Sequence, residues 1–224
     1  MSLILNIETA TKNCSVSLAK DGELLALKEV NNGQYSHGEN LHVFIEAVFS
    51  EVSSTMSELD AIAVSKGPGS YTGLRIGVST AKGLCYSLDK PLVSVPTLAI
   101  LAAQIKVTPL DLIIPLLDAR RMEVYSAVFN ANGDQLRDTE AEIIDAFSFA
   151  DYLKKTNIHF LGDGAEKCAE VIDHRNAIFH NNHFPSAKEM AHLSFEKYKK
   201  SDIEDVAYFE PFYLKDFLIS KPKS

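Results

Sequence analysis

The sequence predicts an α/β protein built from two halves that share one order of elements. Apolar and alternating runs typical of strands are interleaved with longer runs of helical periodicity. The order strand–strand–strand–helix–strand–helix appears in residues 1–105 and starts again at residue 106. We therefore expect two subdomains, residues 1–105 and 106–224, with the C-terminal segment packing back on the first.

The first half opens with three predicted strands. They are Leu3–Ile7, Cys14–Leu18 and Leu24–Val30, and the turn signal Asp21-Gly22 makes the last two a hairpin. Ser36 and Glu39 form a capping-box pattern, which predicts a helix over residues 36–52. Its apolar face is Leu41, Phe44, Ile45, Val48 and Val52. A buried strand (Leu59–Ser65), a helix ending near Leu88, a strand (Pro91–Val95) and a helix over residues 96–105 complete this half.

The second half repeats this plan. The expected strands are Leu112–Leu117, Met122–Phe129, Gln135–Ile144 and Ile158–Leu161, and the expected helices are residues 145–155, 165–173 and 186–199. An acidic residue follows the first strand of each half, Glu8 in one and Asp118 in the other. A glycine turn follows the fourth strand of each half.

This duplicated βββαβα unit resembles the actin, Hsp70 and sugar-kinase superfamily. In that superfamily the first-strand acidic residues of the two halves face one another across a nucleotide cleft, where a carboxylate holds metal or positions water. The resemblance makes Glu8 and Asp118 candidates for a nucleotide site. Residues 8–11 are equally consistent with a plain strand-end turn. Fold alone does not decide function.

The turn from Gly67 to Gly73 is the most specific local motif. Its glycines and a proline follow a buried strand and precede a helix, which is a usual arrangement for holding an anion with backbone amides. Gly67 and Gly69 are therefore candidates for nucleotide contact. The turn is not a Walker A loop, because Leu74 and Arg75 follow Gly73 where that loop has Lys and Ser or Thr. A tight turn that only allows close helix packing is the alternative.

The helix after this turn carries a stripe of mostly small residues. The stripe is Gly73, Gly77, Thr80, Leu84 and Ser87. Glycine inside a helix costs about 1 kcal/mol relative to alanine, so we expect a close neighbour here. That neighbour is either the helix over residues 36–52 or a helix of another protein. An apolar stripe on another side of the helix suits packing on the sheet.

Composition narrows the function classes. The formal net charge of −8 argues against autonomous nucleic-acid binding, which depends on Lys and Arg. The three cysteines, Cys14, Cys85 and Cys168, are scattered and predict free thiols in a reducing cytoplasm. No apolar run is long enough for a membrane helix, and no signal peptide is expected.

The histidines predict no metal site. His37 and His42 are five residues apart, which is not the spacing of a helical zinc motif. His180 and His183 fall in a polar stretch without an obvious acidic partner. No nucleophile motif is present either, so no catalytic residue is assigned.

Four separated blocks carry a family resemblance. The first is residues 65–77 together with residues 81–84 shortly after it. The others are residues 4–11, residues 118–125 and residues 210–215. They resemble the TsaB (YeaZ) family, a bacterial partner subunit in making the threonylcarbamoyladenosine of tRNA. Tyr71 stands where Phe is common and Lys215 where Arg is common. Glu8 stands where Asp is usual, which argues against a direct nucleotide or metal role there.

The resemblance extends to the catalytic TsaD/Kae1 paralogues, which carry a metal-binding H-x-x-x-H motif. Those two histidine positions fall on Thr97 and Leu101 in this chain. Neither side chain replaces imidazole as a metal ligand. The resemblance therefore implies a non-catalytic partner with no metal or cofactor of its own, and it argues against metallopeptidase chemistry.

The resemblance implies a subunit of the complex that transfers a threonylcarbamoyl group to N6 of the adenosine beside the tRNA anticodon. The implied partners are a TsaD-like catalytic subunit and a TsaE-like ATPase, with a homodimer when the chain is alone and tRNA met only through the complex. The expected interface is Leu41, Phe44, Gly73, Gly77, Thr80 and Leu84. A bulky residue at Gly77 is expected to break the pairing while the chain still folds.

Two other functions stay open at this point. A free-standing kinase or ATPase of the same superfamily would bind ATP tightly and turn it over. A metallopeptidase would retain stoichiometric metal after dialysis.

Overall fold

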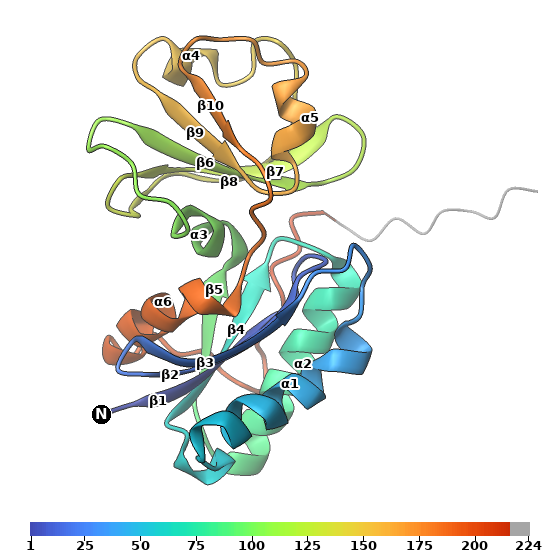
Figure 1. The fold of residues 1–224 in the computed structure, drawn as a ribbon, viewed down its shortest axis with the longest axis vertical. Helices are drawn as coiled ribbons and strands as arrows, with labels where there is room; N and C mark the ends of the chain where they lie inside the picture. The colour runs from blue at the N-terminus through green and yellow to red at the C-terminus, as the bar shows by residue number, and fades with distance from the viewer. Residues whose placement is uncertain (216–224) are drawn as a thin grey trace, which may run out of the picture.

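The computed structural model describes residues 1–215 and places residues 112–180 above the first half of the chain, with α3 between them (Figure 1). The first half contains β1 (Leu3–Glu8), β2 (Cys14–Lys20), β3 (Glu23–Val30), α1 (His37–Val52), the 3-10 turn η1 (Met56–Glu58), β4 (Ala61–Gly67), α2 (Tyr71–Leu88), β5 (Leu92–Pro96) and α3 (Thr97–Ala102). The remainder contains β6 (Leu112–Asp118), β7 (Glu123–Asn130), β8 (Gln135–Ile143), α4 (Ala150–Leu153), β9 (Ile158–Leu161), α5 (Ala165–Ala169), β10 (Ala177–His180) and α6 (Ala187–Lys199).

The two sheets have the same topology. The first has the strand order β3-β2-β1-β4-β5, and the second read in the same sense is β8-β7-β6-β9-β10. In each sheet the three leading strands are antiparallel, and the last two run parallel to the first strand of that half. The duplicated α/β fold of the actin, Hsp70 and sugar-kinase class is therefore confirmed.

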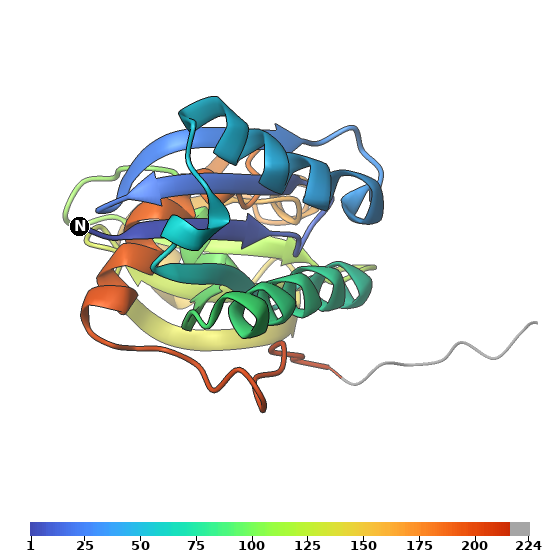
Figure 2. The same ribbon diagram turned by 90° about the horizontal axis from the view of Figure 1, so that it is seen from below.

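Helices cover both faces of the first sheet (Figures 1 and 2). The alternation of side chains along a strand sends Leu5 and Ile7 of β1 toward α1 and α2, while Ile4 points toward α6. On the α6 side, Ala187 and Met190 are fully buried against the sheet. The helix at the C-terminal end of the chain thus completes the core of the first half.

Buried hydrogen bonds anchor α6 to the first sheet. The amide of Ala187 donates to Ser15 Oγ at 2.8 Å, and Ser17 Oγ donates to the Ala187 carbonyl at 2.7 Å. Further along the helix, Ser194 Oγ donates to Asn6 Oδ1 at 2.6 Å. Small polar residues on β1 and β2 therefore form hydrogen bonds with a helix that is distant in the sequence. Asn6 and Ser194, for example, are 188 positions apart.

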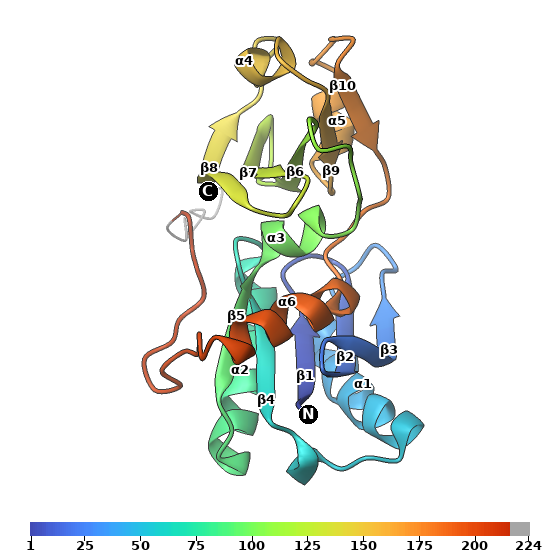
Figure 3. The ribbon, with the colours of Figure 1, turned by 90° about the vertical axis from the view of Figure 1, so that its left-hand side faces the viewer.

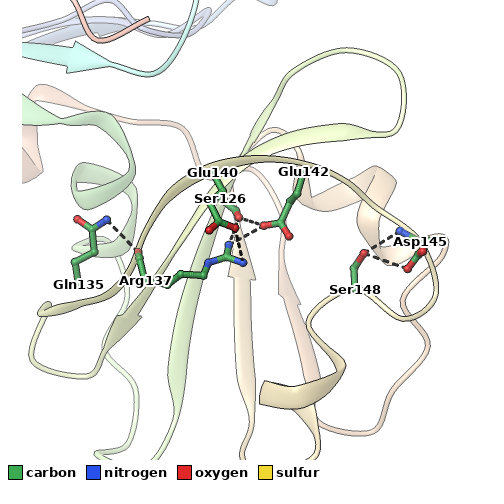
Figure 4. Close-up of polar contacts among 7 residues, drawn as sticks. All are labelled: Ser126, Gln135, Arg137, Glu140, Glu142, Asp145 and Ser148. Atoms are coloured by element: carbon green, nitrogen blue, oxygen red, sulfur yellow. Dashed lines mark hydrogen bonds and ion pairs between the residues drawn. The ribbon is translucent and has the colours of Figure 1, made fainter. Parts of the chain in front are cut away.

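Some expected elements differ from the structure. Strand β10 was not predicted, because four residues carry too little periodicity to stand out from a loop. The helix expected over residues 145–155 is reduced to α4, since Asp145 and Ser148 form a hydrogen-bonded turn before it (Figure 4). The capping box at Ser36 is also wrong, because Ser36 Oγ has no hydrogen-bond partner.

The three cysteines are all buried with free thiols, and none forms a disulfide. Among the described residues, no helix combines the length and the apolar character that crossing a membrane requires.

Candidate functional site

The glycine turn between β4 and α2 packs against the loop that follows β1. The Ser70 amide donates to the Ala10 carbonyl at 2.6 Å, and the Gly73 amide donates to Ser70 Oγ at 3.3 Å. A Cβ at Gly69 would lie 2.4 Å from the Ala10 oxygen. These amides, which an anion would need, are thus engaged within the chain.

The other side of the turn is covered by the C-terminal segment. The Phe212 amide donates to the Lys66 carbonyl at 2.7 Å, and a Cβ at Gly67 would lie 2.6 Å from the Phe212 oxygen. Gly67 also has a φ of +109°, a conformation that favours glycine. Close packing within the chain accounts for both Gly67 and Gly69, and a nucleotide contact at them stays a prediction.

Glu8 lies at the end of β1 and is completely buried. Its Oε1 accepts hydrogen bonds from the Ala10 amide at 2.5 Å and from Ser65 Oγ at 3.0 Å, while Oε2 has no partner. Burial raises the pKa of Glu8 from 4.5 to about 7, and the hydrogen bonds from Ala10 and Ser65 only partly oppose this. The Glu8 carboxyl thus lies inside the loop after β1. Its hydrogen bond from the Ala10 amide stabilises the turn that packs on α2.

Asp118 has a different environment at the end of β6. Its side chain is 45% exposed, forms an ion pair with Lys167 and accepts the Arg120 amide at 3.1 Å. Its own amide donates to Asp163 Oδ1 at 2.9 Å. Within residues 1–215 no hydrogen bond or ion pair joins Asp118 to the buried Glu8. Their joint role at a nucleotide stays a prediction.

The small residues of α2 have a neighbour that was not expected. A Cβ at Gly73 would lie 2.1 Å from the Thr9 carbonyl oxygen, and one at Gly77 would lie 2.2 Å from Thr9 Oγ1. Thr9 Oγ1 also donates to the Gly73 carbonyl at 2.8 Å. The closest neighbour is therefore the loop after β1, and the expected helix also approaches, because the His37 ring at the start of α1 would lie 3.3 Å from a Cβ at Gly73. A larger side chain at Gly77 would collide with Thr9, so the expectation that a bulky residue there breaks the pairing while the chain still folds stays a prediction, and such a variant would also disturb packing within the chain.

The other residues of the expected interface differ in exposure. Leu41 is fully buried in the core under α1 and cannot reach a partner in this conformation. Phe44 and Leu84 are half-buried against the same core, and Thr80 is half-buried on α2. Gly83 was missed, although it is the exposed glycine of α2 and a Cβ there would meet nothing within 4 Å.

Thr97 and Leu101, at the positions of the paralogues' histidine ligands, are both completely buried. The described residues contain no group of three or more His, Cys, Asp or Glu side chains able to hold a metal ion. Sequence analysis did miss one cluster, since His180 Nε2 lies 2.9 Å from His159 Nδ1 and His159 Nε2 lies 3.5 Å from Asp111. His159 and His180 come from β9 and β10, and Asp111 directly precedes β6, so no sequence motif pointed to them.

A polar cluster on the second sheet centres on Arg137 of β8 (Figure 4). Its guanidinium donates to Glu142 Oε1 at 2.7 Å and to the fully buried Ser126 Oγ at 2.5 Å, and it lies 3.4 Å from Glu140. The guanidinium also lies 5.5 Å from the ring centroid of Phe149. Because the Arg137 and Glu142 charges are paired and mostly buried, the cluster is a structural link between β7 and β8, with the more exposed Glu140 at its edge.

Arg137→Ala is expected to lower the free energy of unfolding by about 2 kcal/mol, because it removes the cation paired with the partly buried Glu142 and the donor to Ser126 Oγ, leaving Glu142 only its hydrogen bond from Ser126. Urea unfolding of both proteins measures this. In a double-mutant cycle, Glu142→Gln should make the Arg137 substitution less costly. A loss below about 0.5 kcal/mol would show that the cluster is energetically neutral.

Comparison with known proteins identifies relatives. Residues 31–220 match the family TsaD, tRNA N6-adenosine threonylcarbamoyltransferase. The tRNA threonylcarbamoyladenosine biosynthesis protein TsaB of Bacillus subtilis is 29% identical over 225 residues, which covers 95% of this chain and 93% of that protein. Both matches extend over most of the chain.

Solved structures agree with these sequence matches. An uncharacterized protein from Pseudomonas aeruginosa with similarity to peptidase YEAZ superposes with a TM-score of 0.83 at 25% identity, over 96% of this chain and 100% of that one. The activator of 2-hydroxyisocaproyl-CoA dehydratase from Clostridium difficile, solved with bound ADPNP, reaches 0.50 at 13% identity over 90% and 96% of the two chains, which shows the shared fold alone. The chain belongs to the TsaB (YeaZ) family, which is related to the TsaD threonylcarbamoyltransferases.

Proposed function

We propose that this chain is an accessory subunit in tRNA threonylcarbamoyladenosine biosynthesis, and that it supports a TsaD-like catalytic subunit without performing the transfer itself. The observation that carries the proposal is the family match over most of the chain, combined with Thr97 and Leu101 at the positions of the metal ligands. Buried threonine and leucine side chains offer no imidazole to a catalytic metal.

The packing of the glycine turn supports an accessory role. The Ser70 and Gly73 amides bond within the chain, and the Glu8 carboxyl occupies the loop beside them. The buried Glu8 carboxyl also accepts the Ala10 amide, so that amide is not available to a phosphate. The proposal therefore assigns no cofactor to this chain. It places the chain in the cytoplasm, where the tRNA is modified.

The proposed docking face is the exposed side of α2 together with the neighbouring α1, which lie side by side on one face of the first sheet (Figure 2). It includes the half-buried Phe44, Thr80 and Leu84 and the exposed Gly83. A helix surface with small residues lets a partner helix approach closely. The partner is the TsaD-like subunit, a TsaE-like ATPase joins the complex, and in isolation the same face forms a homodimer.

Gly83→Arg is expected to abolish co-purification with the TsaD-like subunit. An arginine there would project into the docking face, while nothing within this chain obstructs its Cβ. Replacing a helical glycine should also leave the monomer at least as stable, by up to about 1 kcal/mol. The measurement is co-expression with an affinity tag on the TsaD-like subunit, followed by circular dichroism of the isolated variant.

Ala146→Arg is the matched control, because it adds the same side chain at an exposed position in the second half of the chain. It should co-purify like the wild type. If the Gly83→Arg protein still binds its partner at wild-type affinity, α2 does not form the interface. If the wild-type chain does not co-purify at all, the accessory role itself is refuted.

A further inference from the structure

At the junction of the two sheets, the C-terminal segment runs along the first half and rises toward the second sheet (Figure 3). Cations and tyrosines lie beside this segment. Lys82 Nζ donates to the Phe209 carbonyl at 2.9 Å, and Lys215 at the end of the described chain forms an ion pair with Glu123. We call the cations and tyrosines beside this segment the basic track. Its members are Lys12, Tyr71, Arg75, Arg120, Arg121, Tyr213 and Lys215.

The first part of the basic track is a stack on α2. The Arg75 guanidinium carbon lies 5.1 Å from the ring centroid of Tyr71, and its Nη1 donates to the Tyr71 hydroxyl at 3.2 Å. The rings of Tyr71 and Tyr213 are 4.9 Å apart with an interplanar angle of 37°. Tyr213 keeps 37% of its surface exposed. An arginine and an accessible aromatic ring therefore lie next to each other.

The second part of the basic track lies on the turn between β6 and β7. Burial raises the pKa of Tyr125, and the cations of Lys215 and Arg120 oppose that rise, so both lie near its hydroxyl. Arg120 and the following Arg121 have φ angles of 70° and 50°. Such angles are uncommon outside glycine, asparagine and aspartate. The turn thus holds two adjacent arginines on the surface.

Lys12 brings the loop after β1 to the same junction. Desolvation raises the pKa of Asp163 in the glycine turn of the second half, and among the groups that oppose this is the Lys12 ammonium. Lys12 is exposed and belongs to the first half of the chain. The basic track is therefore built from both halves of the chain.

The cations of the basic track are mostly unpaired. Lys215 has Glu123, but within residues 1–215 no ion pair reaches Lys12, Arg75, Arg120 or Arg121. The carboxylate nearest the arginine turn, Asp118, is already paired with Lys167. In a chain with a formal net charge of −8, five cations thus lie along one segment, beside the acidic side chains of Glu123 and Glu210. Such a surface attracts anionic partners and the rest of the chain repels them, which orients the encounter.

We propose that the basic track binds tRNA directly when this chain is assembled with its catalytic partner, an inference that rests on the proposed function. Arginine guanidinium groups bind phosphate oxygens in pairs of parallel hydrogen bonds, which suits the Arg120–Arg121 turn to an RNA backbone. Exposed tyrosines next to cations provide stacking platforms for unpaired bases, as Tyr213 does beside Arg75. An acidic protein is the alternative partner for the basic track. Such a protein would pair with the cations, but it would not use the tyrosines for base stacking.

The test measures tRNA affinity of the reconstituted complex as a function of salt. The variant is Arg120→Asn with Arg121→Asn, because asparagine tolerates their left-handed backbone. The control is Lys154→Asn with Lys155→Asn, which removes the same charge from the end of α4 in the second half. We expect the arginine variant to weaken tRNA binding on the order of tenfold at 0.1 M salt and to reduce the slope of log K against log salt by about 1.5. The control should change neither.

The outcomes separate the two proposals. Failure of the wild-type chain to assemble refutes the proposed function and this inference with it. An assembled arginine variant with wild-type affinity and salt slope refutes the RNA surface alone. Loss of assembly in a variant whose circular dichroism is unchanged assigns the arginine turn to a protein contact, which also overturns the RNA surface.

Discussion

The free energy of unfolding of the wild-type chain should fall by about 3 kcal/mol between pH 4.5 and pH 8 through Glu8 alone. Burial raises the pKa of this carboxyl from 4.5 to about 7. The folded state therefore binds the proton more tightly than the unfolded state. The resulting stability is fully present below pH 4.5 and is lost as the pH rises through about 7, where Glu8 must ionise in the core.

The surroundings of Glu8 explain why ionisation is costly. Two hydrogen bonds reach Oε1, but within residues 1–215 no donor reaches the buried Oε2 and no ion pair to the carboxyl is formed. Cys14 lies close enough that the Glu8 charge contributes, after burial, to raising the thiol pKa to about 11. His37 also packs on this loop through the Thr11 carbonyl, and burial lowers its pKa. His37 therefore destabilises the fold on the acidic side, below its ordinary pKa of 6.5.

Glu8→Gln isolates this contribution. Glutamine keeps the shape and the acceptor oxygen but cannot ionise, so its unfolding free energy should lack the loss between pH 5 and pH 8 that the wild type shows. The difference between the two proteins cancels the contribution of His37, which both retain. Urea unfolding across this pH range gives the difference directly. Parallel pH profiles for the two proteins would show that Glu8 ionises freely, for example because water reaches Oε2.

The fold was largely predictable because its elements are marked locally. Alternation along β2, apolar periodicity along α1 and the Asp21-Gly22 turn all appear within short windows, so the duplicated topology followed from their order. Strand β10 and the short α4 were not predictable in this way. Both are four residues long and owe their conformation to neighbours, β9 for the strand and the turn at Asp145 for the helix.

The site was only half predictable. Glycine lowers the stability of a helix, so the glycines of α2 indicate that a neighbouring group lies close to Gly73 and Gly77. The sequence does not identify that group. The neighbour proved to be Thr9, which is 64 positions from Gly73 in sequence and meets it only because β1 and β4 are adjacent. The basic track has the same origin, since Tyr213 reaches Tyr71 of α2 and Lys215 reaches Glu123 of β7 only because the C-terminal segment crosses the junction.

Gly73→Ala is expected to destabilise the chain by about 3 kcal/mol. The added methyl group would lie 2.1 Å from the Thr9 carbonyl oxygen, a backbone atom that can move only if the whole loop after β1 moves. That loop also holds the Ser70 amide through Ala10 and His37 through Thr11. The better helix propensity of alanine, worth about 1 kcal/mol, cannot compensate. Thermal or urea unfolding measures the loss.

Two other glycines of α2 serve as internal controls. Gly77→Ala should also destabilise, but its methyl group meets the side-chain atom Thr9 Oγ1, so Thr9→Ala should restore part of the lost stability. The same Thr9→Ala change should not rescue Gly73→Ala, where the obstacle is backbone. Gly83→Ala should stabilise by up to about 1 kcal/mol, because nothing lies within 4 Å of its Cβ. Equal effects at all three positions would mean that helix propensity alone governs α2, whereas the graded pattern would establish the loop after β1 as the reason for its glycines.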